Sequence, residues 1–305
     1  MPMPKLTILI TGCSPGGMGA ALAITLHRAG HRVFATARDP SKLLALADQG
    51  IETLPLDITS PQSIISVVTS LTATLSTPAT SPPSLDILIN NAAGSYNMPL
   101  ADASLPSVRS LFETNVFAQL AVTQALLPLL LASPTNNPVI VNHTSVGSVA
   151  AIPFQGIYNA SKAALAMLTT TLRLELAPFG VRVVEIKTAA VRTNIIGNSS
   201  FNREGARLPE GSIYAGVREV VEKAMSQENF KDRGVSAEEW AEEVVGKLLG
   251  GFEGAKLPGV IWAGESAMIS RVVSATPCGL GLFEGMARRM TGLDVVEGMV
   301  KDGRT

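Results

Sequence analysis

The chain has 305 residues, of which 46% are hydrophobic, and a formal net charge of −1 from 24 basic and 25 acidic residues. This composition supports a sizeable buried core, and the lack of a basic block argues against nucleic acid as a partner. The two cysteines and three histidines are scattered without metal-ligand spacing, so we expect neither a metal site nor a disulfide framework. A reducing compartment, the cytoplasm, fits this pattern best.

The chain ends show no pattern of a membrane-spanning protein. The N-terminal MPMPKLTILIT runs directly into a short β-like segment that is too brief for the core of a signal peptide. No window of about 18 uninterrupted apolar residues follows, so we expect no transmembrane segment. The apolar C-terminal stretch with Arg288 and Arg289 leaves two alternatives. We favour core or dimer contacts over a loose peripheral association with a lipid surface.

Apolar, β-branched runs alternate with helical patterns along the first two thirds of the chain. The runs lie at 6–11, 32–37, 51–56, 85–90, 138–143 and 181–186, and the helical patterns begin near Met18, Pro40, Pro61, Leu105 and Tyr158. This order is typical of βαβ units in a parallel sheet with helices on both faces. We therefore predict an α/β fold, a Rossmann-like doubly wound parallel sheet.

The alternation stops after Glu185. Residues 193–234 are polar and contain glycine, and a capping box of Ser236 and Glu239 then opens a helix. We interpret the chain as a single domain, 1–305. Its predicted parts are a nucleotide-binding and catalytic core at 5–192, a substrate lid and helix at 193–250, and a last strand with an apolar tail at 251–305. The Pro/Ser/Thr-rich segment 76–84 is expected to be a surface loop.

A glycine-rich turn, TGCSPGGMG at 11–19, follows the first expected strand and precedes a helix. Glycines at such a place let the backbone approach a pyrophosphate at a helix N-terminus. Taken alone, the motif also fits a plain flexible turn, but ligands of doubly wound sheets bind at the carboxyl ends of the strands, where this turn falls. The candidate cofactor contacts in it are Gly12, Ser14, Gly17, Met18 and Gly19.

The end of the second expected strand, ATARDP, bears on the choice of dinucleotide. Ala37 stands where an acidic residue would bind a free ribose 2′-hydroxyl, and Arg38 follows it. Arginine forks onto phosphate oxygens, so this pair favours NADPH over NADH. Pairing with Asp39, or simple solvation, is the alternative for Arg38. Asp57, after the third strand, is interpreted as an acceptor for the adenine amino group or as a loop N-cap.

Ser145, Tyr158 and Lys162 are the candidate catalytic residues. Tyr158 and Lys162 are four residues apart in a helical pattern, so both side chains project from one face. A nearby ammonium stabilises a phenolate and lowers the pKa of a tyrosine toward the working range. Ser145 ends a β-branched run thirteen residues before Tyr158, so a substrate oxygen could rest between the two hydroxyls. A YxxxK pair alone occurs by chance, and the ordered motifs before it give it weight.

Together these motifs resemble the short-chain dehydrogenase/reductase family over roughly residues 5 to 200. The resemblance implies that Ser145 holds a substrate carbonyl and that Tyr158 exchanges its proton. It also implies that Lys162 lowers the tyrosine pKa and binds the nicotinamide ribose, and that Asn115 orders a proton-relay water. Without the resemblance, Asn115 has the pattern of a buried helix asparagine.

Further features of the resemblance concern cofactor binding. It implies that Asn91 packs near the adenine ribose and that Thr193 contacts the carboxamide. The family's Pro-Gly pair after the sixth strand is replaced by Thr188 and Ala189, and the glycine turn is one residue longer than usual. The longer turn and ATAR resemble a subgroup that includes the fungal and yeast NADPH-dependent acyl-dihydroxyacetone phosphate reductases, which act on lipid-like ketones.

The sequence therefore predicts an NADPH/NADP+-dependent oxidoreductase that interconverts a ketone and a secondary alcohol on an apolar, lipid-like or natural-product substrate. The alternative is a non-redox proton-transfer enzyme on the same scaffold: a dehydratase, isomerase or cyclase. A regulatory dinucleotide-binding protein is disfavoured, because it would not need all four catalytic-type residues. Arg192, Arg203 and Arg207 are candidates for an anionic head group or plain surface arginines. The resemblance also implies a homo-oligomer, a dimer or tetramer.

Overall fold

The computed structural model describes residues 4–76, 82–135, 137–197, 205–276 and 279–302. Arg203, Cys278 and much of the predicted surface loop at 76–84 lie outside the described residues.

The strands form one parallel sheet in the order β3-β2-β1-β4-β5-β6-β7. They span Thr7–Ile10 (β1), Arg32–Ala37 (β2), Glu52–Pro55 (β3), Ile87–Asn90 (β4), Val139–Ser145 (β5), Arg182–Thr188 (β6) and Val260–Ala263 (β7). The six β-branched runs and the expected last strand are all present, so the predicted doubly wound fold is confirmed. The strand order reverses between β1 and β4, which is where such sheets bind ligands.

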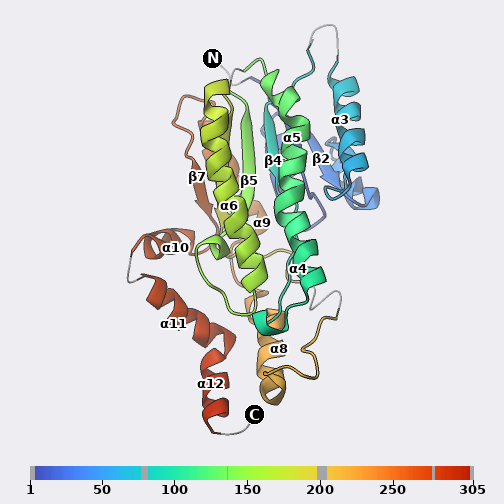
Figure 1. The fold of residues 1–305 in the computed structure, drawn as a ribbon. Coiled ribbons are helices and arrows are strands. Elements are labelled where there is room, and N and C mark those ends of the chain that lie inside the picture. The colour runs from blue at the N-terminus through green and yellow to red at the C-terminus, as the bar shows by residue number, and fades with distance from the viewer. Residues whose placement is uncertain (1–3, 77–81, 136, 198–204, 277–278, 303–305) are drawn as a thin grey trace.

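Helices cover both faces of this sheet. They span Met18–Arg28 (α1), Leu44–Ala47 (α2), Pro61–Leu75 (α3), Leu105–Phe112 (α4), Ala118–Leu131 (α5), Gly156–Leu176 (α6), Arg218–Ser226 (α8), Ala237–Gly250 (α9), Ala267–Ser274 (α10), Gly279–Thr291 (α11) and Leu293–Lys301 (α12). In Figure 1, α3, α5 and α6 lie in front of the sheet and α9 lies behind it. The hydrophobic core is divided accordingly, with α1 and α9 on one side and α3 and α5 on the other.

Helix α9 begins at the predicted capping box. The Ser236 side chain accepts a hydrogen bond from the Glu239 backbone N–H, and the Glu239 carboxylate accepts one from the Ser236 N–H. Two otherwise unsatisfied donors of the first turn are thereby paired. The helix then buries Trp240 completely against the sheet, at the carboxyl end of β5.

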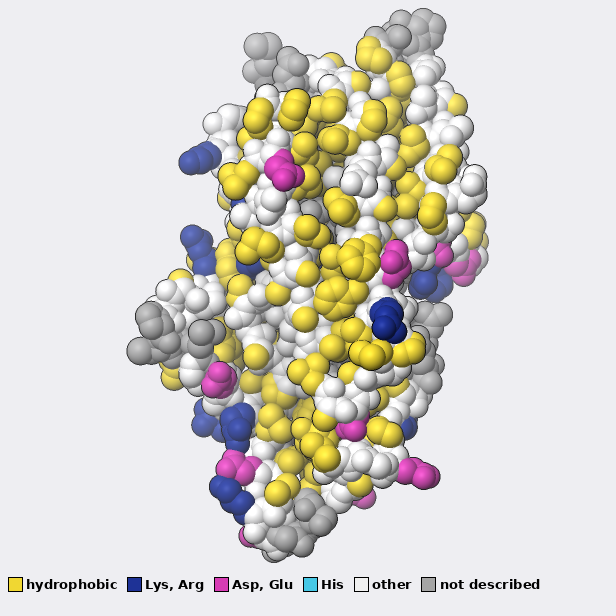
Figure 2. Space-filling view, viewed as in Figure 1, with side chains coloured by type: hydrophobic (Ala, Val, Ile, Leu, Met, Phe, Trp, Pro, Cys, Tyr) yellow, Lys and Arg dark blue, Asp and Glu magenta, His cyan; other side chains and the backbone are white. Residues whose placement is uncertain are grey.

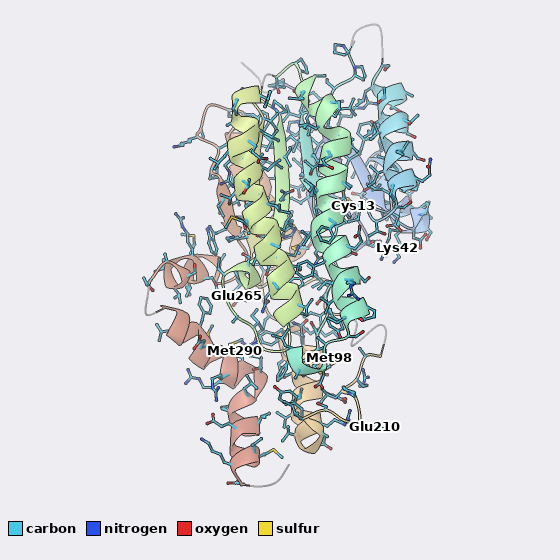
Figure 3. The ribbon with its side chains drawn as sticks, viewed as in Figure 1. Cys13, Lys42, Met98, Glu210, Glu265 and Met290 are labelled. Atoms are coloured by element: carbon cyan, nitrogen blue, oxygen red, sulfur yellow. The ribbon has the colours of Figure 1, made fainter. Side chains whose placement is uncertain are left out.

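A third apolar cluster lies beyond the carboxyl ends of the strands. Val217, Val221 and Met225 of the α8 region pack there with Tyr96 and Met98 of the segment after β4. Figure 3 shows Met98 below the sheet, next to α8. Helix α8 was not expected from the polar character of 193–234, although its buried residues recur at a spacing of four.

The C-terminal tail forms helices, and its last one packs against the lid. Val296, Leu293 and Met299 of α12 join the same apolar cluster as α8. The stretch with Arg288 and Arg289 lies in α11, so for it the choice between core or dimer contacts and a lipid surface stays a prediction. Helix α11 lies farther out, with Leu282 and Met286 exposed.

One helical stretch, Leu105–Leu131, is long and apolar enough to cross a membrane by length and composition alone. It comprises α4, a π-helical turn and α5, and half of its most apolar window is buried in the protein. A core helix that covers a sheet passes the same test.

Candidate active site

A cavity of about 640 Å³ opens at the carboxyl ends of the strands. Its walls come from the β1–α1 turn, from the ends of β2 to β6, and from α4 and α6. The predicted site residues that line it are Gly12, Ser14, Gly17, Met18, Arg38, Asp57, Asn91, Ser145, Tyr158, Lys162 and Thr193. Gly19 and Asn115 are not among the described residues that line it. The candidate cofactor turn and the candidate catalytic residues thus face one space.

The glycine turn packs tightly against the segment after β4. Gly12 has φ +74°, and a Cβ added there would lie 2.6 Å from the Ala92 Cα. At Gly19, an added Cβ would lie 2.4 Å from the Asn91 Nδ2 and 2.5 Å from the Gly12 carbonyl oxygen. Gly19 therefore serves close packing of the turn, and its contact with a cofactor stays a prediction. Gly17 is the N-cap of α1 and lines the cavity, so the helix N-terminus is open to an anion there.

Two cations mark the far end of the cavity. Arg38 and Lys42 both line it, and Lys42, which lies in the short 3₁₀ helix Pro40–Leu43 four residues after Arg38, was not anticipated. Asp39 accepts hydrogen bonds from the N–H and hydroxyl of Ser41, and within the described ranges no ion pair joins it to Arg38. The suggested neutralisation of Arg38 by Asp39 is therefore wrong.

Asp57 closes a turn beside these cations. Its Oδ1 accepts from the Thr59 backbone N–H at 3.0 Å and from the Thr59 hydroxyl at 2.7 Å. Burial alone would raise the pKa of Asp57, but these hydrogen bonds and the charge of Arg38 lower it below its ordinary value. Asp57 therefore closes a turn with Thr59, and the N-cap of the following helix α3 is Ser60 and not Asp57. A contact with adenine stays a prediction.

Ser145, Tyr158 and Lys162 are brought together as predicted. Ser145 ends β5, and its hydroxyl accepts a hydrogen bond from the Gly147 N–H at 3.1 Å and also hydrogen-bonds with the Tyr158 phenol. Tyr158 and Lys162 lie one turn apart on α6. The Lys162 Nζ is 5.8 Å from the centre of the Tyr158 ring and donates to the His143 carbonyl oxygen at 2.9 Å.

The electrostatics differ from the expectation in one respect. Burial raises the pKa of Tyr158, and the hydrogen bond with Ser145 opposes this only in part. The predicted lowering of the tyrosine pKa by Lys162 is therefore not seen in the folded chain. Burial also lowers the pKa of Lys162 from 10.5 to about 8, so the ammonium is mostly charged at neutral pH. The phenol is protonated, as a proton donor has to be.

Comparisons with known proteins agree with this geometry. The sequence model of the family described as short chain dehydrogenase matches residues 6–204, more than half of the chain. A short-chain dehydrogenase/reductase of Pestalotiopsis microspora is 46% identical over 301 residues, which cover 99% of both chains. The chain belongs to the short-chain dehydrogenase/reductase family.

Two further relatives support the fold and the subgroup. The NADPH-dependent 1-acyldihydroxyacetone phosphate reductase of Schizosaccharomyces pombe is 34% identical, over 88% of this chain and 89% of that protein. The crystal structure of a short-chain dehydrogenase from Streptomyces avermitilis superposes with a TM-score of 0.72 at 25% identity, covering 97% of this chain and 98% of the other. The protein is therefore an oxidoreductase of this family with a single Rossmann-like domain.

Asn115 of this short-chain dehydrogenase/reductase lies in a π-helical turn, Glu113–Phe117, between α4 and α5. It is fully buried. Its Oδ1 accepts from the Gly94 N–H at 2.8 Å, and its Nδ2 donates to the Gly94 carbonyl oxygen at 3.1 Å and to the Ser161 hydroxyl at 3.0 Å. The side chain thus anchors the segment after β4 to α6. Its part in a proton relay stays a prediction.

The sequence interpretation missed His143, which lies two residues before Ser145 on β5. Its ring hydrogen-bonds Asn91 through Nδ1 and Thr188 through Nε2, and it stacks on Trp240 with ring centres 5.1 Å apart. Burial and the charge of Lys162 lower the pKa of His143 to about 3, so the ring is neutral. The sequence places His143 on the fifth strand, but it does not show the partners of the ring, which come from distant parts of the chain.

The other end of the cavity has mixed walls, in which Ser107, Ser110 and Thr114 lie among the lining residues together with apolar side chains. Tyr96, Leu111 and Ile195 line it beside Tyr158. Phe154 has φ +64°, an uncommon backbone conformation for a bulky residue, and its carbonyl oxygen accepts from the Met98 N–H at 2.8 Å.

Polar contacts tie the lid segment to the segment after β4. The Asn97 Nδ2 donates to the Met225 carbonyl oxygen at 2.8 Å, and the Ser212 hydroxyl donates to the Asp102 carboxylate at 2.7 Å. Arg192 donates to the Gly234 carbonyl oxygen, which turns it toward the backbone.

Proposed function

We propose that this enzyme is an NADP(H)-dependent oxidoreductase that interconverts a ketone and a secondary alcohol on an apolar, lipid-like or natural-product substrate. One observation carries the proposal. A single cavity joins the glycine turn and Arg38 at one end to Ser145, Tyr158 and Lys162 at the other. A dinucleotide that reaches between these ends brings its nicotinamide beside the proton donor.

The residues of the cavity fit NADP(H) in particular. The open N-terminus of α1 at Gly17 suits a pyrophosphate, and Arg38 with Lys42 suits a ribose 2′-phosphate. No acidic residue stands at Ala37 to bind a free 2′-hydroxyl. The name of the Schizosaccharomyces pombe relative, an NADPH-dependent reductase, supports the same choice.

When bound, NADP(H) supplies or accepts the hydride. The chain's own residues handle the proton. In reduction, the Ser145 hydroxyl donates a hydrogen bond to the substrate carbonyl oxygen, and Tyr158 transfers its phenolic proton to that oxygen as the alcohol forms. The buried Lys162 ammonium, 5.8 Å from the ring centre, stabilises the phenolate that remains. We assign the return of a proton to Tyr158 to the predicted relay at Asn115.

The substrate end supports an apolar ketone. Its walls include apolar surface at Tyr96, Leu111 and Ile195, and no lysine or arginine of the described lid residues lines the cavity. We therefore propose residues 193–250 as the lid and helix that cover the substrate and exclude water. The 1-acyldihydroxyacetone phosphate in the name of the Schizosaccharomyces pombe relative is a ketone with an acyl group, although it also carries a phosphate.

We also propose a homo-oligomer, built on the outer surface of α4 to α6. Figure 2 shows apolar side chains spread over this face, with charged side chains mostly at its margins. The exposed large apolar residues of these helices and their flanking turns are Leu105, Phe117, Leu131, Met167, Leu168, Leu174 and Phe179. A second copy of the chain is the occupant we propose for this face. The molar mass in solution tests this, and the cytoplasmic location stays a prediction.

Incubation with NADPH and a panel of apolar ketones tests the function. We expect one alcohol formed for each NADPH oxidised, with deuterium from labelled NADPH on the carbinol carbon. Product formed without any change in the redox state of the cofactor would support the non-redox alternative and overturn the proposal. The Tyr158→Phe enzyme is the control for background reduction.

A further inference from the structure

A chain of hydrogen bonds runs from the catalytic end of the cavity to the glycine turn. The Thr188 Oγ1 is 2.6 Å from the His143 Nε2, and the His143 Nδ1 is 2.9 Å from the Asn91 Oδ1. The Asn91 Nδ2 continues the chain to the carbonyl oxygens of Thr11 and Gly12, at 2.9 and 3.0 Å. Three elements, β4, β5 and β6, are thereby linked below the cavity floor.

The direction of every bond in this chain is determined by Asn91. Its amide nitrogen donates to two carbonyl oxygens, which accept only, so its Oδ1 has to act as the acceptor toward His143. The proton of the neutral imidazole is therefore on Nδ1. The Nε2 is left as an acceptor, and the Thr188 hydroxyl has to donate to it.

The surroundings of His143 keep this tautomer in place. The ring is buried and stacked on Trp240, with an angle of 17° between the ring planes. The Lys162 ammonium is held at the His143 carbonyl oxygen, which disfavours a second positive charge on the ring. A neutral ring with one fixed donor and one fixed acceptor is the result.

Thr188 therefore offers the cavity an acceptor and no donor. Its one hydroxyl proton points at His143, and only its lone pairs remain for a ligand in the cavity that it lines. Its neighbour on the adjacent strand, Ser145, has the opposite polarity, because the Ser145 hydroxyl accepts from Gly147 and directs its proton toward Tyr158, where a ligand oxygen can accept it. A ketone oxygen is an acceptor, so it can bind Ser145 but gains nothing from Thr188.

We propose that His143 and Thr188 form a positioning pair that presents a hydrogen-bond acceptor to the carboxamide N–H of the nicotinamide, and so selects the orientation in which the ring binds beside Tyr158. This inference rests on the proposed NADP(H) function. The pair occupies the place where Thr188 and Ala189 replace the family's Pro-Gly, so the side-chain acceptor is a property of this chain's own sequence.

A pair of cofactors that differ only in the carboxamide provides the test. The 3-acetylpyridine analogue of NADPH carries a methyl ketone in place of the amide and has no N–H to donate. We expect Thr188→Val to weaken NADPH binding about two- to tenfold and to leave the affinity for the analogue within about twofold, since a neutral hydrogen bond is lost only with NADPH. Thr188→Ser, which keeps the hydroxyl, should bind both cofactors as the wild type does. Affinities are measured by fluorescence titration, without turnover.

His143→Phe tests the partner of Thr188. Phenylalanine keeps a ring against Trp240 but accepts no hydrogen bond, so the Thr188 hydroxyl becomes free to turn and donate. The ratio of the two affinities should then shift in favour of the analogue, whose ketone oxygen accepts. If this variant does not fold, the Thr188 pair of variants decides alone.

The outcomes separate the two levels of the proposal. Equal losses for both cofactors in Thr188→Val, or no loss for either, would overturn the inference while NADPH binding by the wild type stands. Failure of the wild type to bind NADPH at all would overturn the proposed function, and the inference with it. We expect every variant to bind 2′,5′-ADP as the wild type does, because that ligand lacks the nicotinamide. A variant that loses affinity for both 2′,5′-ADP and NADPH would contradict a role of Thr188 and His143 at the carboxamide alone.

Discussion

The two ends of the cavity are built in different ways. At the cofactor end, strand ends and a glycine turn are packed so closely that a Cβ at Gly19 would lie 2.4 Å from Asn91. Beyond the substrate end, apolar side chains from the segment after β4, from α8 and from α12 form one cluster, and a few side-chain hydrogen bonds such as Ser212 to Asp102 tie these segments together. Cofactor chemistry is shared by a whole family and constrains backbone geometry, whereas substrate shape is set by apolar packing that many sequences can achieve.

If this contrast is correct, a change at Tyr158, between the two ends of the cavity, should slow the reaction and leave cofactor binding intact. Tyr158→Phe keeps the ring but removes the proton donor, so we expect kcat to fall about 10²- to 10⁴-fold. NADPH affinity should stay within about twofold, because no more than one neutral hydrogen bond is removed. Single-turnover kinetics and a fluorescence titration measure the two quantities.

Tyr214→Phe is the matched control. Tyr214 packs edge-on against Phe154 in the lid segment and is not among the described residues that line the cavity. It should turn over the substrate as the wild type does. Unchanged turnover in Tyr158→Phe would contradict the mechanism.

Lys162 is expected to serve function at a cost in stability. Lowering the pKa of Lys162 from 10.5 to about 8 destabilises the folded chain by about 3 kcal/mol at neutral pH. The hydrogen bond to the His143 carbonyl oxygen, which a substitution would remove, stabilises it by about 1 kcal/mol. Lys162→Met should therefore raise the free energy of unfolding by about 2 kcal/mol, while kcat falls. Urea unfolding measures it, with the exposed Lys256→Met as control, which should change stability by less than about 0.5 kcal/mol.

The sign of the pH effect follows from the same lysine. Between pH 8 and 10.5 the unfolded chain binds more protons at Lys162 than the folded chain, so the stability of the wild type gains a contribution that grows with rising pH. Lys162→Met should lack this contribution. A variant less stable than the wild type at neutral pH, or one with the same pH dependence, would show that the buried charge carries no such cost.

The smallest effect is expected at the substrate end. Ser212→Ala removes the hydrogen bond to Asp102 that ties the lid segment to the segment after β4. Loss of a bond worth about 1 kcal/mol should raise the substrate KM about fivefold and leave the NADPH dissociation constant unchanged. Ser274→Ala on α10, far from the cavity, serves as control. If Ser212→Ala also raised the NADPH dissociation constant about fivefold, the two ends of the cavity would not act independently.

The sheet and most of the site follow from local sequence patterns. The β-branched runs predict β1 to β6, and the capping box predicts the start of α9, because each signal lies within a few residues. The predicted residues that line the cavity, such as Ser145, Tyr158 and Lys162, were recognised by the order of their motifs along the chain, whereas Lys42 and His143 were not. What local patterns cannot show is how distant groups meet.

Three differences illustrate this limit. His143 gains its role from Thr188, Asn91 and Trp240, which are far from it in the sequence. Gly19 was assigned to the cofactor but packs against Asn91. The raised pKa of Tyr158 reflects burial by surrounding elements, which the spacing to Lys162 does not reveal. Each depends on long-range packing, and so does the unexpected α8.

Titration with NADPH and NADH tests the central claim most directly, carried out on the wild type, on Arg38→Ala and on the control Arg28→Ala. Arg28 ends α1, is exposed and does not line the cavity. A charge-assisted hydrogen bond to a 2′-phosphate predicts that the wild type binds NADPH about 10- to 100-fold more tightly than NADH, and that Arg38→Ala alone loses this preference. Equal affinities in the wild type, or binding of neither dinucleotide, would contradict the account.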